Sequence, residues 1–293
     1  MISISIVIPA YNAQKYIKCA VDSALTQTYR NFEVVVVDDG STDDTREILK
    51  EYGSSIRLIC QHNEGTAAAC NAGVLAAGGE RIAFLDADDQ WLPQKLERQM
   101  RDCADFAISH TDSICFGDEC SAEVRRSAIQ KMYSGFVLEK LVVSNFITKS
   151  TVIVSRDVYR DAGGFASKYD AVEDWPLWMK ICAKHELGYV AEPLARYRVH
   201  QLSKSMRARL TDAAHMKIIG DAFSEDGVAR EFVGLRRPAI AQSSAINAHY
   251  AAMSGDWFWA ARCAFRSICN GNFGPQNWKI LVKTMLSPLG VKY

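Results

Sequence analysis

The chain has 293 residues, with 34 basic and 34 acidic side chains and therefore no formal net charge. A balanced charge argues against bulk electrostatic binding of nucleic acid, which requires a basic face. Nine scattered cysteines, without CxxC or Cys/His zinc spacing, indicate reduced thiols in a cytosolic protein and not a disulfide framework.

The N-terminal sequence MISISIVIPAYN lacks the basic segment and the small-residue cleavage site of a secretory signal peptide. No apolar run approaches the roughly 20 residues that a membrane-spanning helix needs. We therefore expect a soluble, cytoplasmic protein. Peripheral contact with the inner face of the cell membrane stays open.

Short apolar runs and helical patterns alternate through the first hundred residues. The apolar runs predict strands at 3–8, 32–37, 56–60 and 81–89. The segments between and after them predict helices at 13–27, 43–52, 66–77 and 93–102. This alternation is typical of a doubly wound α/β sheet, in which ligands bind beyond the carboxyl ends of the strands.

The regular alternation fades after residue 104. Strands are predicted within 104–116, at 150–155 and, as one or two strands, within 189–200, and a helix is predicted at 174–185. From about residue 206 the patterns predict helices near 207–223, 238–253, 256–269 and 276–286. We place a domain boundary near 205, with an α/β domain at 1–205 and a helical region at 206–293.

Acidic residues follow two of the predicted strands. The four valines at 34–37 lead into Asp38 and Asp39, and the fourth strand ends in Asp86, Asp88 and Asp89. If these strands are parallel and neighbouring, their carboxyl ends share one rim, and up to five carboxylates line one cleft. The alternative, that strand-end aspartates only cap helices and make turns, is preferred for the two aspartates at 43 and 44.

Carboxylates that lie close together need a compensating cation. The spacing of Asp86 and Asp88 puts both side chains on the same side of an extended segment. Mg²⁺ or Mn²⁺ binds a few carboxylates and shares the phosphate oxygens of a substrate. The pattern therefore predicts a divalent metal and a nucleotide diphosphate or sugar-nucleotide partner.

Asp174 begins the predicted helix in VEDWPLW and is a candidate general base for deprotonating a hydroxyl. An aspartate at a helix start is also a normal cap, so position alone leaves both roles open. Trp175 can stack on a sugar ring or belong to the core, and the sequence does not separate these roles.

Six segments, taken together and in order, resemble family 2 glycosyltransferases with the GT-A fold. They are VIPAYN at 7–12, QTY at 27–29, VVVVDDGSTDDT at 34–45, Asn63-x-Gly65 with Asn71-x-Gly73, FLDADD at 84–89, and Glu173-Asp174-Trp175. The resemblance covers roughly residues 3–205. It implies a Rossmann-like mixed sheet flanked by helices, here with a C-terminal helical extension.

The resemblance implies metal-dependent, inverting transfer of a sugar from a UDP- or dTDP-type donor to a hydroxyl. The acceptor would be a glycan or a polyprenyl-linked oligosaccharide, in the synthesis of a bacterial surface polysaccharide. Glu173 would orient the acceptor or a flap, and Asp174 would be the catalytic base. The donor-binding residues would be Pro9, Ala10, Tyr11, Asn12, Asp38, Asp39, Asn63, Gly65, Asn71, Asp86 and Ala87.

In this resemblance Asp88 would ligate the metal, and His200 would supply a further ligand from the RVH segment. Residues 201–207 would form a flap, with Lys204 or Arg207 near the diphosphate. One position departs from the family pattern, because Cys70 stands where the family often has an arginine that organises the donor site. Arg81 or Lys204 is a candidate replacement for that arginine.

Other functions stay open. A nucleotidyltransferase shares the α/β core and an acidic metal site, but PAYNAQKY is not its usual Gly-rich, basic phosphate loop. A nucleotide-sugar-binding assembly protein without turnover is slightly favoured by Cys70. Four residues oppose it, namely Asp86, Asp88, Asp174 and His200. A dinucleotide oxidoreductase is excluded because no GxGxxG follows the first strand.

The helices after residue 206 have apolar faces flanked by basic residues, such as Trp278 and Val282 beside Lys279 and Lys283. Such a face suits packing on another helix, and it also suits an amphipathic helix in a membrane interface. Both roles stay open, as does a homo-oligomer contact.

Overall fold

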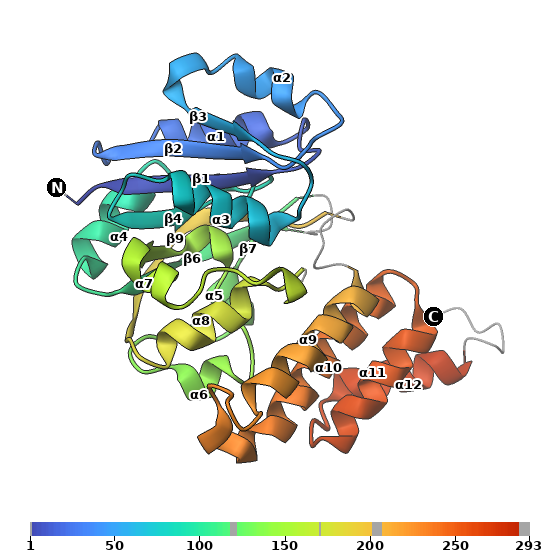
Figure 1. Cartoon of the computed structure of the whole chain (residues 1–293). Helices are drawn as coiled ribbons and strands as arrows, with labels where there is room; N and C mark the ends of the chain where they lie inside the picture. The colour runs from blue at the N-terminus through green and yellow to red at the C-terminus, as the bar shows by residue number, and fades with distance from the viewer. Residues whose placement is uncertain (1, 118–121, 170, 201–206, 287–293) are drawn as a thin grey trace. The chain divides into compact units, whose positions relative to one another are not determined.

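The structure is a computed structural model that describes residues 2–117, 122–169, 171–200 and 207–286 (Figure 1). Contacts divide the chain into two units. The described residues within 1–137, 146–168 and 173–199 form the sheet unit, and those within 138–145, 169–172 and 200–286 form the helical unit. The change of unit at residue 199 lies close to the predicted boundary at 205, but two short earlier segments also belong to the helical unit.

Four parallel strands form one half of the sheet. They are β1 (Ile4–Ala10), β2 (Phe32–Asp38), β3 (Arg57–Cys60) and β4 (Arg81–Phe84), in the order β3-β2-β1-β4. The strands β2 and β4 are thus parallel, as the sequence predicts, but β1 lies between them. Their carboxyl ends still reach the same edge of the sheet, and β1 supplies the centre of that edge.

Alternating side chains explain why the valines of β2 are continuous. Val34 and Val36 pack in the cluster that includes α1 (Ile17–Leu25), α2 (Thr45–Lys50) and α4 (Lys95–Cys103). Val35 and Val37 pack on the other face, against Ala69 of α3 (Thr66–Ala76). Because both faces are covered, the run Val34–Val37 contains no polar residue, which is typical of a buried parallel strand.

The second half of the sheet makes it mixed. The strand β8 (Ile153–Ser155) pairs antiparallel with β4, and β6 (Ile108–Phe116) pairs antiparallel with β8. The strand β9 (Leu187–Arg198) runs parallel to β6, while β5 (Gln90–Trp91) and β7 (Val124–Arg125) add short antiparallel pairs. This arrangement confirms the predicted mixed sheet flanked by helices.

Short helices complete the sheet unit. They are η1 (Gly53–Ser55), α5 (Arg126–Ile129), η2 (Lys149–Thr151), α7 (Arg156–Asp161), η3 (Ser167–Tyr169, whose last residue belongs to the helical unit) and α8 (Asp174–Cys182). Aromatic packing fixes α8, because Trp178 and Phe165 lie at 5.6 Å between ring centroids and both also contact Phe84 of β4. The end of β4 and the middle of α8 are therefore joined through one aromatic core.

The helical unit contains α6 (Leu138–Leu141), α9 (Ala208–Ala222), η5 (Arg230–Leu235), α10 (Arg236–Met253), α11 (Trp257–Cys269) and α12 (Pro275–Leu286). Its core consists mainly of small residues, including Ala248, Ala260 and Ala264, which let helices approach closely. Asp256 caps α11 by accepting a hydrogen bond from the Trp259 amide at 3.2 Å. The helix positions agree closely with those that the sequence predicts.

None of the helices formed by the described residues combines the length and the apolar character that crossing a membrane requires.

Candidate active site

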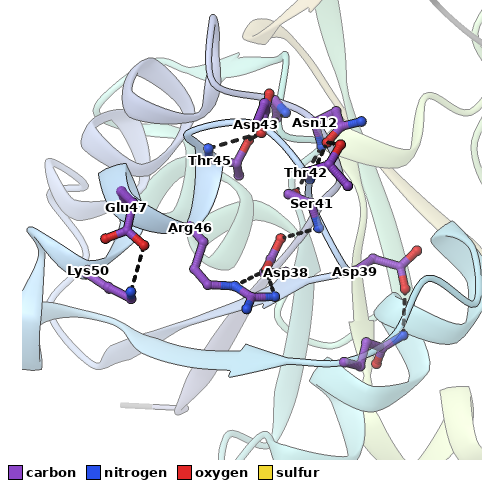
Figure 2. A network of polar contacts seen from close by, with 12 residues as sticks. Asn12, Asp38, Asp39, Ser41, Thr42, Asp43, Thr45, Arg46, Glu47 and Lys50 are labelled. Carbon is purple, nitrogen blue, oxygen red and sulfur yellow. Dashed lines mark hydrogen bonds and ion pairs between the residues drawn. The ribbon is translucent and has the colours of Figure 1, made fainter.

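The edge formed by β1, β2 and β4 carries the first pair of predicted acidic residues. Asp38 is the last residue of β2 and is aligned with Ala10, and the Asp39 amide donates to the Ala10 carbonyl at 2.8 Å. Figure 2 shows that the two carboxylates point in different directions. Adjacent residues at a strand end face opposite sides, so Asp38 and Asp39 do not share one cleft.

Asp38 serves the local structure. Its carboxylate is fully buried and accepts bonds from Arg46 Nε and the Ser41 amide, with an Arg46 Nη2 contact at 2.7 Å (Figure 2). These contacts attach the β2–α2 turn to α2. The expectation that Asp38 lines an open cleft is therefore wrong, and its predicted contact with the donor has no support in the geometry.

Asp39 is held in a fixed orientation on the other side. Its Oδ1 accepts from Gln61 Nε2 at 2.8 Å and from the Glu64 amide at 2.9 Å, and its Oδ2 accepts from the Gly65 amide at 2.9 Å. Gly40 makes this packing feasible, because a Cβ there would lie 2.8 Å from the backbone nitrogen of Asn63 and φ is +75°. The turn before α3 thus positions Asp39 before any ligand binds.

The loop after β1 is attached to the β2–α2 turn. The Asn12 amide donates to Ser41 Oγ at 3.0 Å, and the Thr42 amide donates to Asn12 Oδ1 at 2.8 Å (Figure 2). Asn12 has a φ of +48°, a conformation that asparagine adopts more readily than most residues. Of the predicted donor-binding residues in this segment, Tyr11 is 49% exposed, whereas Pro9 and Ala10 are buried.

The second acidic group follows β4, and its members differ sharply in environment. Asp89 is buried and accepts from Ser150 Oγ at 2.5 Å and from the Arg198 amide at 2.8 Å. Burial, together with Asp88 and Asp86 nearby, raises the pKa of Asp89 well above its usual value. Asp89 therefore points inward and braces the loop. The expectation of five carboxylates in one cleft is wrong for Asp89 as it is for Asp38.

Asp86 contacts a buried cation that the sequence analysis missed. The Lys149 ammonium lies 2.8 Å from Asp86 Oδ1 and 3.4 Å from Glu173 Oε1. Burial alone would lower the pKa of Lys149, but the acidic groups around it, first of all Asp86, outweigh burial and raise that pKa well above its ordinary value. The sequence signal was a lone lysine in FITKSTVIV, just before a buried strand.

Glu173 and Asp174 stand at the start of α8. Glu173 occupies the N-cap position without a side-chain capping bond and is buried, while Asp174 is the first helical residue and is partly exposed. The N-cap position that competed with the base role for Asp174 thus belongs to Glu173. Trp175 is only 1% exposed, so it belongs to the core and does not stack on a sugar.

Asn71, which belongs to the predicted donor-binding motif on α3, has a structural role. Asn71 Nδ2 donates to the Phe165 carbonyl at 2.8 Å, and its Oδ1 accepts from the Tyr159 hydroxyl and the Phe165 amide. These bonds fix Asn71 to the segment before α8, which leaves its predicted donor contact without support. Asn63 is exposed beside the Asp39 turn, and Ala87 is almost completely buried.

Arg81 does not replace the arginine that the family often has at the position of Cys70. Its guanidinium donates to the backbone carbonyls of Phe106 at 2.6 Å and Ala104 at 2.7 Å, away from the acidic residues. The other candidate, Lys204, lies outside the described residues, as does the predicted flap at 201–207 except for its last residue. That residue, Arg207, is exposed at the start of α9 in the helical unit, and its role near the diphosphate stays a prediction. Within the described part of the chain, Lys149 is the cation paired with Asp86.

The residues after β4 fit a divalent cation in part. Desolvation raises the pKa of Asp86, with a further contribution from the nearby charge of Asp88 and opposition from Lys149, and the Asp86 side chain is 27% exposed. Among the described residues, no three His, Cys, Asp or Glu side chains form a ready-made metal cage. Hard carboxylate oxygens at a half-open edge suit Mg²⁺ or Mn²⁺, which keep waters and phosphate oxygens as ligands. The predicted ligand His200 belongs to the helical unit, and its role stays a prediction.

Comparisons with known proteins agree with this geometry. The model of glycosyl transferase family 2 matches residues 5–127. The Escherichia coli protein WfgD, named a UDP-Glc:α-D-GlcNAc-diphosphoundecaprenol β-1,3-glucosyltransferase, is 30% identical over 240 residues, which cover 78% of this chain and 88% of WfgD. WfaP of Escherichia coli, which carries the same activity name, is 35% identical over 62% of this chain and 70% of its own length.

Other relatives are much longer than the matched segment. The chain matches an uncharacterized glycosyltransferase of Rickettsia bellii at 32% identity over 200 residues, which is 67% of this chain but 29% of that protein. For the corresponding proteins of Rickettsia felis and Rickettsia conorii the share is 33%. The chain therefore spans about a third of the length of these relatives.

Solved structures confirm the fold. Residues 1–349 of S. aureus TarS in complex with UDP-GlcNAc superpose with a TM-score of 0.64 over 99% of this chain and 93% of that chain, at 16% identity. The mannosyltransferase PcManGT of Pyrobaculum calidifontis, in complex with GDP-Man and Mn²⁺, gives a TM-score of 0.59 over 98% and 87%, at 19% identity. At these identities the likeness concerns the fold alone.

Proposed function

The chain belongs to glycosyl transferase family 2, and from this premise we propose that it is an inverting glycosyltransferase. It moves a sugar from a nucleotide-diphosphate donor to a hydroxyl of a lipid-linked glycan. The observation that carries the proposal is that Asp86, after β4, and Glu173, beside Asp174 at the start of α8, meet at one lysine. Distant segments of the chain thus bring donor-side and acceptor-side carboxylates together.

The donor is a uridine nucleotide sugar. Asp39 presents a carboxylate whose orientation three hydrogen bonds fix, so it can accept a bond from the ring N–H of uracil without reorganising. Both Escherichia coli relatives carry names that specify UDP-glucose. A dTDP sugar would offer the same ring N–H, so competition between the two nucleotides tests this choice.

The acceptor is a sugar on a polyprenyl diphosphate. The support is the activity name shared by WfgD and WfaP, which states GlcNAc-diphosphoundecaprenol as the acceptor. The product would extend a surface glycan.

Asp174 is the catalytic base. It lies at the first position of α8, partly exposed, and takes the proton from the acceptor hydroxyl as that oxygen attacks the anomeric carbon. A single in-line attack inverts this carbon. A divalent ion bound at Asp88 would neutralise the charge that builds on the departing diphosphate. Asp86 holds the donor beside this position.

The test is a UDP-release assay with UDP-glucose, UDP-GlcNAc and dTDP-glucose, Mn²⁺ and a lipid-diphosphate GlcNAc analogue. Asp174→Asn should lower kcat by about 1,000-fold or more, because the attacking hydroxyl loses its base, while UDP binding stays within about twofold. The matched control is Asp157→Asn, which changes an exposed carboxylate in the first turn of α7 and should leave kcat unchanged.

Normal turnover by Asp174→Asn would remove Asp174 from the base role. A wild-type chain that binds UDP but releases none from any donor would favour a binding protein without turnover. Release of pyrophosphate from UTP would favour nucleotidyl transfer.

A further inference from the structure

Lys149 occupies an unusual position for a lysine. It begins η2, directly before β8, and its side chain is 10% exposed between two carboxylates. Burying an ion pair costs free energy through desolvation, so such a group is more often retained for a specific arrangement than for stability. The two carboxylates come from segments far apart in the chain, one after β4 and one at the start of α8.

We propose that Lys149 is a positioning residue for the glycosyl transfer, joining the donor-side carboxylate Asp86 to the helix that begins with Asp174. This inference rests on the proposed function. The ammonium contacts Asp86 on one side and Glu173, the residue before Asp174, on the other. It therefore sets the spacing between the donor and the base.

Three other basic side chains of the sheet unit near the strand ends bind partners other than Asp86 and Glu173. Arg46 pairs with Asp38, and Arg81 bonds backbone carbonyls. Arg198 donates to the Asp88 carbonyl at 2.8 Å, and its guanidinium lies over the rings of Tyr16 and Phe116. None of these three side chains forms an ion pair with Asp86 or Glu173 in the described structure, so these two carboxylates depend on Lys149.

Cys70 of α3 approaches the same group without contributing charge. It is completely buried and lies close enough to interact electrostatically with Lys149, Asp86, Glu173 and Asp174. Burial, only partly opposed by Lys149, raises the pKa of this thiol to about 12, so it stays neutral at physiological pH. Position 70 thus lies on another element, near the same charged group.

The removal of Lys149 would leave the buried carboxylate of Glu173 and the partly exposed carboxylate of Asp86 without the cation that they share. Their repulsion and desolvation would push Asp86 and the start of α8 apart or force one of them to bind a proton. Reaction rates depend steeply on alignment, so this displacement should act mainly on kcat and less on donor binding.

The experiment compares four chains in the UDP-release assay: wild type, Lys149→Met, Lys149→Arg and the double variant Cys70→Arg/Lys149→Met. Lys149→Met should lower kcat by about 100-fold with a change in donor KM below about tenfold, as a displacement of about 1 Å would. Lys149→Arg should restore kcat to within about tenfold of wild type. The double variant should exceed Lys149→Met by about tenfold, because it returns a positive charge from α3.

Cys70→Ser/Lys149→Met is the matched control, since it changes position 70 without supplying charge and should stay as slow as Lys149→Met. A purely structural role for Lys149 predicts a lower unfolding midpoint with wild-type kcat and KM in the folded fraction, and that result would overturn the proposal. So would a double variant that is folded yet no faster than its control.

If Lys149→Met does not fold, Lys149→Gln replaces it throughout, because its amide keeps a hydrogen-bond donor without charge. A wild-type chain that releases UDP from no donor sinks the proposed function itself. The link that Lys149 makes between Asp86 and Glu173 is then tested by thermal unfolding. The variant Lys149→Gln/Glu173→Gln should lower the unfolding midpoint by less than the sum of the shifts of the two single variants. Additive shifts would show that Lys149 and Glu173 are not coupled and would overturn the proposal.

Discussion

Both units bury charged groups, but they satisfy them differently. In the sheet unit, Lys149 holds Asp86 and Glu173, and the Asp86 side chain remains 27% exposed at the strand-end edge. In the helical unit, Asp212 of α9 accepts bonds from Arg266 of α11 and from Asn247 of α10, and Asp212 and Asn247 are buried. We call the first network open, because its carboxylate Asp86 reaches the surface, and the second closed, because its carboxylate Asp212 is 4% exposed and only the cation Arg266 reaches the surface.

This difference separates two uses of buried charge. In the helical unit, the small apolar residues of the core surround a polar network in which misalignment would leave the buried carboxylate of Asp212 unpaired. At the edge of the sheet, carboxylates that keep an open side can bind a donor or a cation. Exposure of the carboxylate distinguishes the candidate active site from the structural network, because Asp86 is 27% exposed and Asp212 is 4% exposed.

Changing one carboxylate in each unit tests the comparison most directly. Asp39→Asn should weaken UDP binding by about 100-fold, because a charge-assisted hydrogen bond to the base is lost. Asp212→Asn should leave UDP affinity of the folded chain unchanged while lowering stability. Titration calorimetry with UDP measures the affinity of both variants, and urea unfolding measures their stability. Equal losses of affinity would erase the distinction between the open and the closed network.

Breaking the closed network tests its structural role. Arg266→Met should lower the free energy of unfolding by about 3 kcal/mol, because Asp212 stays buried without its cation. Asp212→Asn/Arg266→Met should be more stable than Arg266→Met, because the unpaired charge is gone. Urea unfolding measures both variants. A double variant with additive losses would mean that the two side chains are not coupled.

A smaller effect concerns one buried histidine in each unit. Burial lowers the pKa of His110 in β6 to about 4, despite a bond from Nε2 to the Tyr133 carbonyl and the charge of Asp112. Burial, with a smaller contribution from Arg266, also lowers the pKa of His215 in α9 to about 4. Each imidazole must stay neutral in the folded state.

The unfolded chain binds these protons near pH 6.5, so the stabilisation is complete above that pH and declines as pH falls toward 4. Each histidine should cost about 2 kcal/mol between pH 7.5 and 5.0. His110→Phe and His215→Gln should each flatten the dependence in urea unfolding. The exposed His249 offers a control, and His249→Gln should leave the slope as it is. Unchanged slopes in both buried variants would show that these imidazoles charge without penalty.

Local patterns predicted most elements because burial dictates them. The two covered faces of β2 require apolar residues at each of the four positions Val34–Val37, and the helices of the C-terminal region follow their apolar stripes. The pairing order was not accessible in the same way, since β1 separates β2 and β4, and nothing local to a strand specifies its neighbours.

The candidate site was predicted in part. Strand alternation already implied that Asp38 and Asp39 point apart, an inference that the sequence analysis did not draw. Asn71 and Trp175 sit in recognisable motifs, yet their side chains serve packing. Lys149 escaped because its role depends on two carboxylates that the fold brings to it from distant segments. Asp39 and Asp174 stay predictions that the geometry supports.

The order in which the chain visits its two units has a consequence for engineering. The backbone passes between them after residues 137, 145, 168, 172 and 199, so cutting at 199 would not isolate the sheet unit. Such a fragment would keep 138–145 and 169–172 while losing α9, including Asp221, to which the Tyr169 hydroxyl donates at 2.6 Å. Tyr169 lies five residues before Asp174, so a shortened enzyme would lose a contact that holds the segment leading to the proposed base, Asp174.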